Sequence, residues 1–80
     1  MNELEQYRRE IDRIDGELVK LFLERMAVTG QVGAYKQANG IPVLDAEREK
    51  RVIAAKTALT DDPARKADLA ALYESIMAIS

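Results

Sequence analysis

One stretch of the sequence, residues 3–39, constrains the fold more than any other because it carries a regular apolar seam. Its apolar residues recur at alternating intervals of three and four, the spacing of a long helix that packs in coiled-coil fashion. The stretch contains no proline, and its three glycines weaken such a helix without ending it. The seam consists of Leu4, Tyr7, Ile11, Ile14, Leu18, Leu21, Val28, Val32 and Tyr35.

A second, shorter helix is predicted after a connector at residues 40–44. Gly40 is a natural left-handed residue just beyond the end of the long helix. Pro42 prevents the helix from continuing and holds the residue before it extended. Asp45 is a good N-cap, and we expect the second helix to run from it to residue 58 or 59.

A third helix is predicted from Asp62, an N-cap that is followed by Pro63 at the first helical position. The helical spacing of its apolar residues continues up to Ser80, so we expect the C-terminal helix to be truncated. Residues 1–80 are expected to form one domain. No segment alternates as a strand does. The predicted fold class is therefore all-α, with one long and two shorter helices.

The length of the first helix predicts self-association. A helix of about 36 residues is roughly 54 Å long, whereas a compact 80-residue domain has a radius of gyration of only about 12 Å. The remaining residues of one chain cannot cover such a helix. We expect an obligate oligomer, most simply an intertwined two-fold homodimer.

The composition excludes several classes of function. The net charge of −2 favours neither nucleic acid nor an anionic membrane as a partner. The absence of cysteine and histidine removes disulfides, thiolate chemistry, the commonest general base and the commonest metal ligand, so no metal site is predicted. No apolar run is long enough to span a bilayer, and the charged N-terminus is no signal peptide, so the expected location is cytoplasmic.

Arg25 interrupts the seam where a leucine is expected. A lone arginine there would most often pack its stem and extend its head to solvent. Lys36, however, follows eleven residues later on nearly the same face, roughly 16 Å along the axis, so the two long side chains can converge. Arg8 lies about 25 Å from Arg25 on another face, and it is either an exposed residue beside Arg9 or a contribution from an antiparallel partner helix.

In the second helix, Asp45, Arg48 and Glu49 share one face. They are either a cap with a weak surface ion pair, or they place Arg48 and Glu49 toward the first helix. Ser80 follows Ile76 by four residues and lies on a face that leans toward the core. The inward candidates predict a cationic pocket with one carboxylate, suited to a small dianion that bears a hydroxyl. The cations are Arg25, Lys36, Arg48 and an Arg8 from a partner chain, and the carboxylate is Glu49. No nucleophile with a base and no phosphate loop accompanies them.

The order and spacing of several segments resemble the all-helical chorismate mutase family over essentially the whole chain. The resemblance rests on RREIDRID from Arg8, ER at 24–25, VGAYK at 32–36, GIPVLD at 40–45 and REK from Arg48. It implies an intertwined homodimer whose sites combine both chains, and an isomerase that converts chorismate to prephenate for phenylalanine and tyrosine biosynthesis. The reaction is a unimolecular pericyclic step that needs no cofactor. The domain is either free-standing or fused to a dehydratase, dehydrogenase or synthase.

The resemblance also implies roles for individual residues. Arg8 of the opposite protomer and Arg25 match arginines that hold the two substrate carboxylates, and Lys36 matches the lysine that donates to the ether oxygen as its bond breaks. The other matches are Arg48 in the anion site, Asp45 and Glu49 near the ring hydroxyl, and Ser80 beside a carboxylate. The family's glutamine, a second donor to the ether oxygen, would lie beyond Ser80, and loss of such a donor typically lowers the rate by roughly 10²–10³.

Three other functions compete with the mutase. An isochorismate pyruvate lyase uses a similar cationic pocket, and pyruvate release from isochorismate would reveal it. A catalytically silent regulatory or dimerisation module of a shikimate-pathway enzyme would bind ligands without turnover. A plain coiled-coil scaffold would not explain why Arg25, Lys36 and Arg48 fall on converging faces.

The first testable prediction concerns self-association. We expect light scattering at micromolar concentration to give the mass of an oligomer, because the long helix has more apolar surface than one chain can cover. A monodisperse monomer under these conditions would rule this prediction out.

Overall fold

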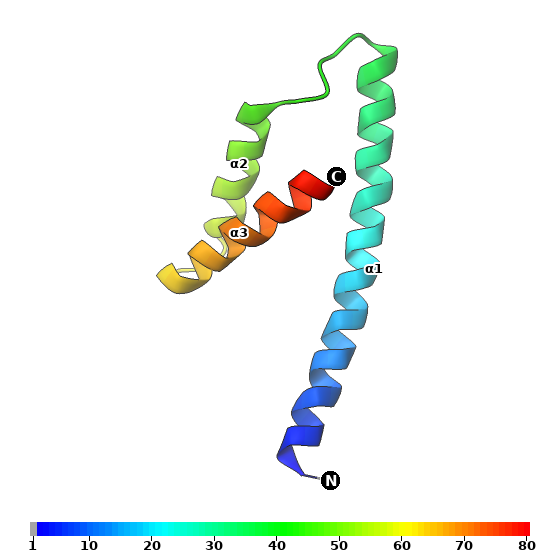
Figure 1. Ribbon diagram of the computed structural model, residues 1–80. Coiled ribbons are helices and arrows are strands. Elements are labelled where there is room, and N and C mark those ends of the chain that lie inside the picture. Colours follow the sequence, from blue (N-terminus) through cyan, green and yellow to red (C-terminus); the bar gives the residue numbers. More distant parts are fainter. Residues whose placement is uncertain (1) are drawn as a thin grey trace. The chain divides into compact units, whose positions relative to one another are not determined.

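Residues 2–80 form three α-helices, which are α1 (Glu3–Ala38), α2 (Ala46–Thr57) and α3 (Pro63–Ile79). They are seen in a computed structural model that describes residues 2–80. Figure 1 shows α1 as one uninterrupted helix, followed by the connector and the two shorter helices. No strand occurs in the described part of the chain, so the all-α prediction with one long and two shorter helices is confirmed.

The end of α1 is built as the sequence predicts. Gly40 adopts a left-handed backbone conformation with φ 66°. The Ile41 N–H donates to the Lys36 carbonyl at 2.8 Å and the Gly40 N–H donates to the Gln37 carbonyl at 3.5 Å. This pair of bonds is the Schellman arrangement, which satisfies carbonyls that the last helical turn leaves open. The helix therefore ends at Ala38, one residue before the expected limit.

The structure divides into two compact units, the first ending at Val32 and the second spanning Gly33–Ser80. The described part of the first unit is almost entirely α1, so this unit has no second helix for the side chains of α1 to pack against. Every apolar seam residue of this unit is exposed; for example, Leu18 is 56% and Leu21 59% exposed. None of residues 2–80 is classed as buried. An apolar face of this length without cover in its own unit is typical of a surface that is buried in an assembly.

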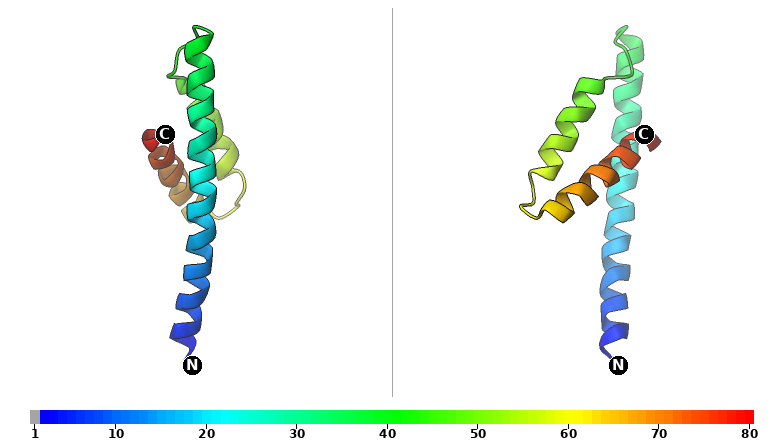
Figure 2. Two further views of the ribbon diagram at one scale, coloured as in Figure 1. Left: turned by 90° about the vertical axis from the view of Figure 1, so that its right-hand side faces the viewer. Right: turned by 60° about the vertical axis from the view of Figure 1, so that its left-hand side comes forward.

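The second unit contains the end of α1, the connector, and the helices α2 and α3, which contact each other and diverge from the turn that joins them (Figure 2). The apolar residues Ile53 and Ile76 are half-buried in this unit. The Lys66 ammonium of α3 donates to the Thr57 carbonyl in the last turn of α2 at 2.9 Å. A lysine in this position satisfies an open carbonyl and suits the negative end of the helix dipole, so it joins the two helices.

The start of α3 follows its sequence signals. The Asp62 carboxylate accepts the Ala64 N–H at 3.0 Å, and Pro63 occupies the first helical turn. The end of α2 comes at Thr57, one or two residues before the expected limit, and the Thr57 hydroxyl donates back to the Ile53 carbonyl at 2.9 Å. Such a bond within the last turn competes with continuation of the helix. Within the described residues, no helix is both long and apolar enough to cross a membrane.

Candidate functional site

Lys36 is hydrogen-bonded to the connector through both its side chain and its backbone carbonyl. Its ammonium donates to the Val43 carbonyl at 3.3 Å, and its own carbonyl accepts the Ile41 N–H at 2.8 Å. The residue lies in the last turn of α1 and is half-buried. The end of the long helix and the connector therefore meet around this one lysine.

Asp45 caps α2, as the sequence predicts. Its carboxylate accepts the Arg48 N–H at 2.9 Å, and its carbonyl accepts the Glu49 N–H at 3.1 Å. A carboxylate at this position satisfies an open donor and suits the positive end of the helix dipole. Because the cap accepts the backbone N–H groups of Arg48 and Glu49, it fixes the backbone positions of these two residues.

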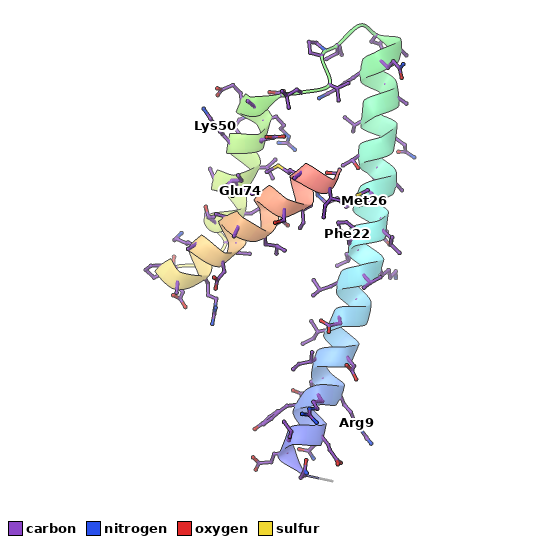
Figure 3. The ribbon with its side chains drawn as sticks, viewed as in Figure 1. Arg9, Phe22, Met26, Lys50 and Glu74 are labelled. Carbon is purple, nitrogen blue, oxygen red and sulfur yellow. The ribbon has the colours of Figure 1, made fainter. Side chains whose placement is uncertain are left out.

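Arg48 and Glu49, in the first turn of α2, differ in their surroundings. Glu49 is half-buried, whereas the Arg48 side chain is exposed. Lys50 and Glu47 lie on the solvated side of α2; their charged groups are 3.8 Å apart and their side chains are 77% and 76% exposed. Lys50 extends away from α2 in Figure 3. Glu49 is therefore the less exposed of these two charged residues, and the Arg48 side chain is accessible to a ligand.

Ser80 caps the C-terminal end of α3. Its hydroxyl donates to the Ile76 carbonyl at 3.0 Å, and its N–H donates to the same carbonyl at 3.1 Å. Tyr73 and Ile76 on this side of α3 are half-buried, in agreement with the predicted face, whereas Ser80 itself is exposed.

The first unit carries the two predicted arginines, both on α1. Arg25 is half-buried and occupies the seam position that the sequence singles out, whereas Arg8 is exposed. Seventeen residues separate them on one helix, which is roughly 25 Å along the axis. A single small ligand therefore cannot contact both arginines of one chain.

In the second unit, hydrogen bonds link most of the predicted site residues through adjoining segments. The Lys36 ammonium contacts Val43, which lies two residues before the Asp45 cap, and the cap in turn holds Arg48 and Glu49. This part of the chain contains the cations Lys36 and Arg48 and the half-buried carboxylate of Glu49. Such a set can bind an anion and accept a hydrogen bond from a hydroxyl.

One group in this region, the Val43 carbonyl, was not predicted from the sequence. A backbone carbonyl occurs in every residue, so no residue type or spacing could have identified it. The only available signal was indirect: Pro42 and the nearby glycine predict a connector without helical hydrogen bonds, which leaves its carbonyls available to side chains.

Comparisons with known proteins agree on one family. The pattern of the chorismate mutase type II family matches residues 7–80. The chain is 36% identical to the T-protein of Haemophilus influenzae over 69 residues, which is 86% of this chain and 18% of that protein. It is 38% identical to the chorismate mutase of Methanocaldococcus jannaschii over 52 residues, which is 65% of this chain and 52% of that protein. The chain thus spans less than two thirds of these curated relatives.

A solved structure of chorismate mutase from Thermus thermophilus is also similar to this chain. The TM-score is 0.91 at 26% sequence identity, and the match covers 98% of both chains.

The capping geometry generates a prediction about stability. We expect Asp45→Ala to lower the free energy of unfolding by about 1 kcal/mol, because the Arg48 N–H loses its acceptor. Asp45→Asn should stay within a few tenths of a kcal/mol, because asparagine caps about as well. Asp61→Ala, which removes an exposed carboxylate of the α2–α3 turn, is the control. Urea unfolding at one protein concentration measures all three, and equal losses for the alanine and asparagine variants at position 45 would contradict the capping role.

Proposed function

Because the chain belongs to the chorismate mutase type II family, we propose that it catalyses the rearrangement of chorismate to prephenate in aromatic amino-acid biosynthesis. The family match over residues 7–80 carries this proposal. The rearrangement is unimolecular and pericyclic, so it requires neither a nucleophile nor proton transfer. A sequence without histidine or cysteine is compatible with that requirement.

In the proposed mechanism, arginines hold the substrate in its reactive shape. The enolpyruvyl arm has to fold over the ring, and this costs conformational freedom. Arg25 and the Arg8 side chain of a second copy each bind one carboxylate, which fixes both ends of the folded substrate. Restricting the substrate to such a conformer before reaction removes part of the entropic barrier.

Lys36 is the proposed electrostatic catalyst. Negative charge develops on the ether oxygen as the carbon–oxygen bond breaks, and a positioned ammonium stabilises that charge more in the transition state than in the ground state. Its half-buried position at the end of α1 supports this role.

The remaining site residues are proposed to orient the substrate. Glu49 accepts a hydrogen bond from the ring hydroxyl, and Asp45 contributes near the same hydroxyl while it caps α2. Arg48 adds positive charge to the anion site, and Ser80 lies beside a carboxylate. The half-buried Glu49 and the exposed Arg48 support this division between acceptor and cation.

The proposed active form is an intertwined homodimer. The exposed apolar seam of α1 supports it, since that surface has no cover within its own unit. The separation of Arg8 from Arg25 along α1 gives a second, independent reason, because only another copy can bring an Arg8 to the substrate.

The competing functions are not favoured by the comparisons. The matched relatives include proteins named chorismate mutase, and none of those reported above is named a lyase. Pyruvate release from isochorismate that exceeds the turnover of chorismate would reverse this ranking. Tight binding of a bicyclic transition-state analogue without turnover would favour the silent module.

The central prediction is loss of chorismate absorbance on addition of the protein. We expect Lys36→Ala to lower kcat by about 10²- to 10³-fold, because one positioned donor to the ether oxygen is lost. Lys50→Ala, which removes an exposed lysine on the solvated side of α2, is the control and should retain near-parental kcat. Equal activity of the two variants would contradict the role of Lys36, and absence of turnover by the parent chain would contradict the function itself.

The shared site predicts rescue between two inactive variants. Arg8→Ala and Lys36→Ala, unfolded together at equal concentration and refolded, should regain about a quarter of the parental activity, because half of the dimers are mixed and each mixed dimer has one intact site. Lys36→Ala refolded with Arg25→Ala should show no rescue. In the proposed dimer the same protomer supplies both residues to a site, so every site of a mixed dimer lacks one of them.

Two controls accompany this mixing experiment. Arg9→Ala removes the neighbouring exposed arginine, which extends outward from α1 in Figure 3, and it should be active without mixing. If Arg8→Ala with Lys36→Ala regains nothing, or if the Arg25 mixture recovers equally, Arg8 does not act across the interface.

A further inference from the structure

The bond between the Lys36 ammonium and the Val43 carbonyl joins the proposed electrostatic catalyst to a backbone group outside α1. The two atoms are 3.3 Å apart and the residues are seven positions apart in the chain. A lysine in the last turn of a helix commonly bonds one of that helix's own final carbonyls. Lys36 instead contacts the connector, whereas its own carbonyl accepts the Ile41 N–H. The contact therefore differs from ordinary helix capping.

We propose that the Val43 carbonyl is a positioning group for Lys36 in the reaction. It holds one of the three N–H donors of the ammonium and leaves the other two for the substrate. Lysine has a flexible four-carbon stem, so an unheld ammonium would have to be ordered during each catalytic cycle. The inference rests on the proposed function and adds the group that places the catalytic donor.

The connector holds this carbonyl in place from both sides. On one side, Gly40 adopts φ 66° and the Ile41 N–H is bonded to α1, so the path of the chain leaving the helix is determined. On the other side, the Asp45 cap holds the start of α2. Pro42, between them, has a restricted φ. Only a few bonds therefore remain through which the Val43 carbonyl could change direction.

The Val43 side chain contributes little to this arrangement, because it is 70% exposed. The proposal concerns the carbonyl, so a side-chain substitution is a weak test. The informative change is replacement of the Val43–Leu44 amide by an ester, which makes the carbonyl a poorer acceptor and leaves both side chains unchanged. The Leu44 N–H that is lost donates to no other described backbone group.

The expected effect separates positioning from binding. A donor that is ordered in advance acts where charge develops, so weakening its anchor should lower kcat and leave KM nearly unchanged. Loss of about 1 kcal/mol of hydrogen bonding corresponds to a rate loss of about fivefold. We therefore expect kcat to fall by about 3- to 10-fold, with KM within about twofold of the parent.

The matched control is an ester one position earlier, at the Pro42–Val43 bond. It weakens the Pro42 carbonyl, which accepts no backbone or lysine hydrogen bond among the described residues. The two esters carry the same chemical change in the same connector, so their free energies of unfolding should differ by no more than the contribution of the weakened hydrogen bond between Lys36 and Val43. Only the Val43–Leu44 ester should lower kcat. Equal kcat values for the two esters, or a rise in KM without a fall in kcat, would overturn the proposal.

A second measurement is independent of turnover. In isotope-labelled protein without substrate, nuclear magnetic resonance should detect a scalar coupling across the hydrogen bond, between the Lys36 side-chain nitrogen and the Val43 carbonyl carbon. The coupling should keep its size in the control ester and become smaller in the Val43–Leu44 ester. Its absence from the parent protein would overturn the positioning proposal, whereas a parent that shows the coupling but does not consume chorismate would overturn the proposed function.

Discussion

The constraint on which the other features depend is a 36-residue helix whose apolar seam has no cover in its own unit. Helices in water gain most of their stability from burial of an apolar face and little from propensity alone. Each fully buried leucine or isoleucine side chain contributes roughly 1.5–3 kcal/mol. The seam therefore holds much of the favourable free energy of the fold, and in the proposed dimer that energy is gained on association.

This constraint also determines where a site can lie. Side chains on one long helix have a fixed spacing, so Arg8 and Arg25 of one chain are held too far apart to serve one small substrate. In the proposed dimer the same rigidity becomes useful, because a neighbouring helix can bring a second arginine without a mobile loop. Assembly, folding and completion of the site are then one event, and dilution should weaken all three together.

The helix limits were largely predictable because local chemistry determines them. The left-handed turn at Gly40 and the caps at Asp45 and Asp62 each depend on one residue type at one position, and all three are confirmed. The candidate site was predictable only as a set of side chains on expected faces. The contact of Lys36 with Val43 could not be predicted, because it depends on the path of the connector and on a group that every residue has.

The chemical nature of the partner of Lys36 supports the positioning argument. A carboxylate would hold the ammonium more strongly, but it would also neutralise the charge that the developing oxyanion requires. A carbonyl anchors the group by its dipole and leaves the full positive charge in place. In a chain without histidine, where charge has to come from lysine and arginine, this distinction matters most. A neutral acceptor at the connector therefore suits a lysine that stabilises a transition state better than an ion pair would.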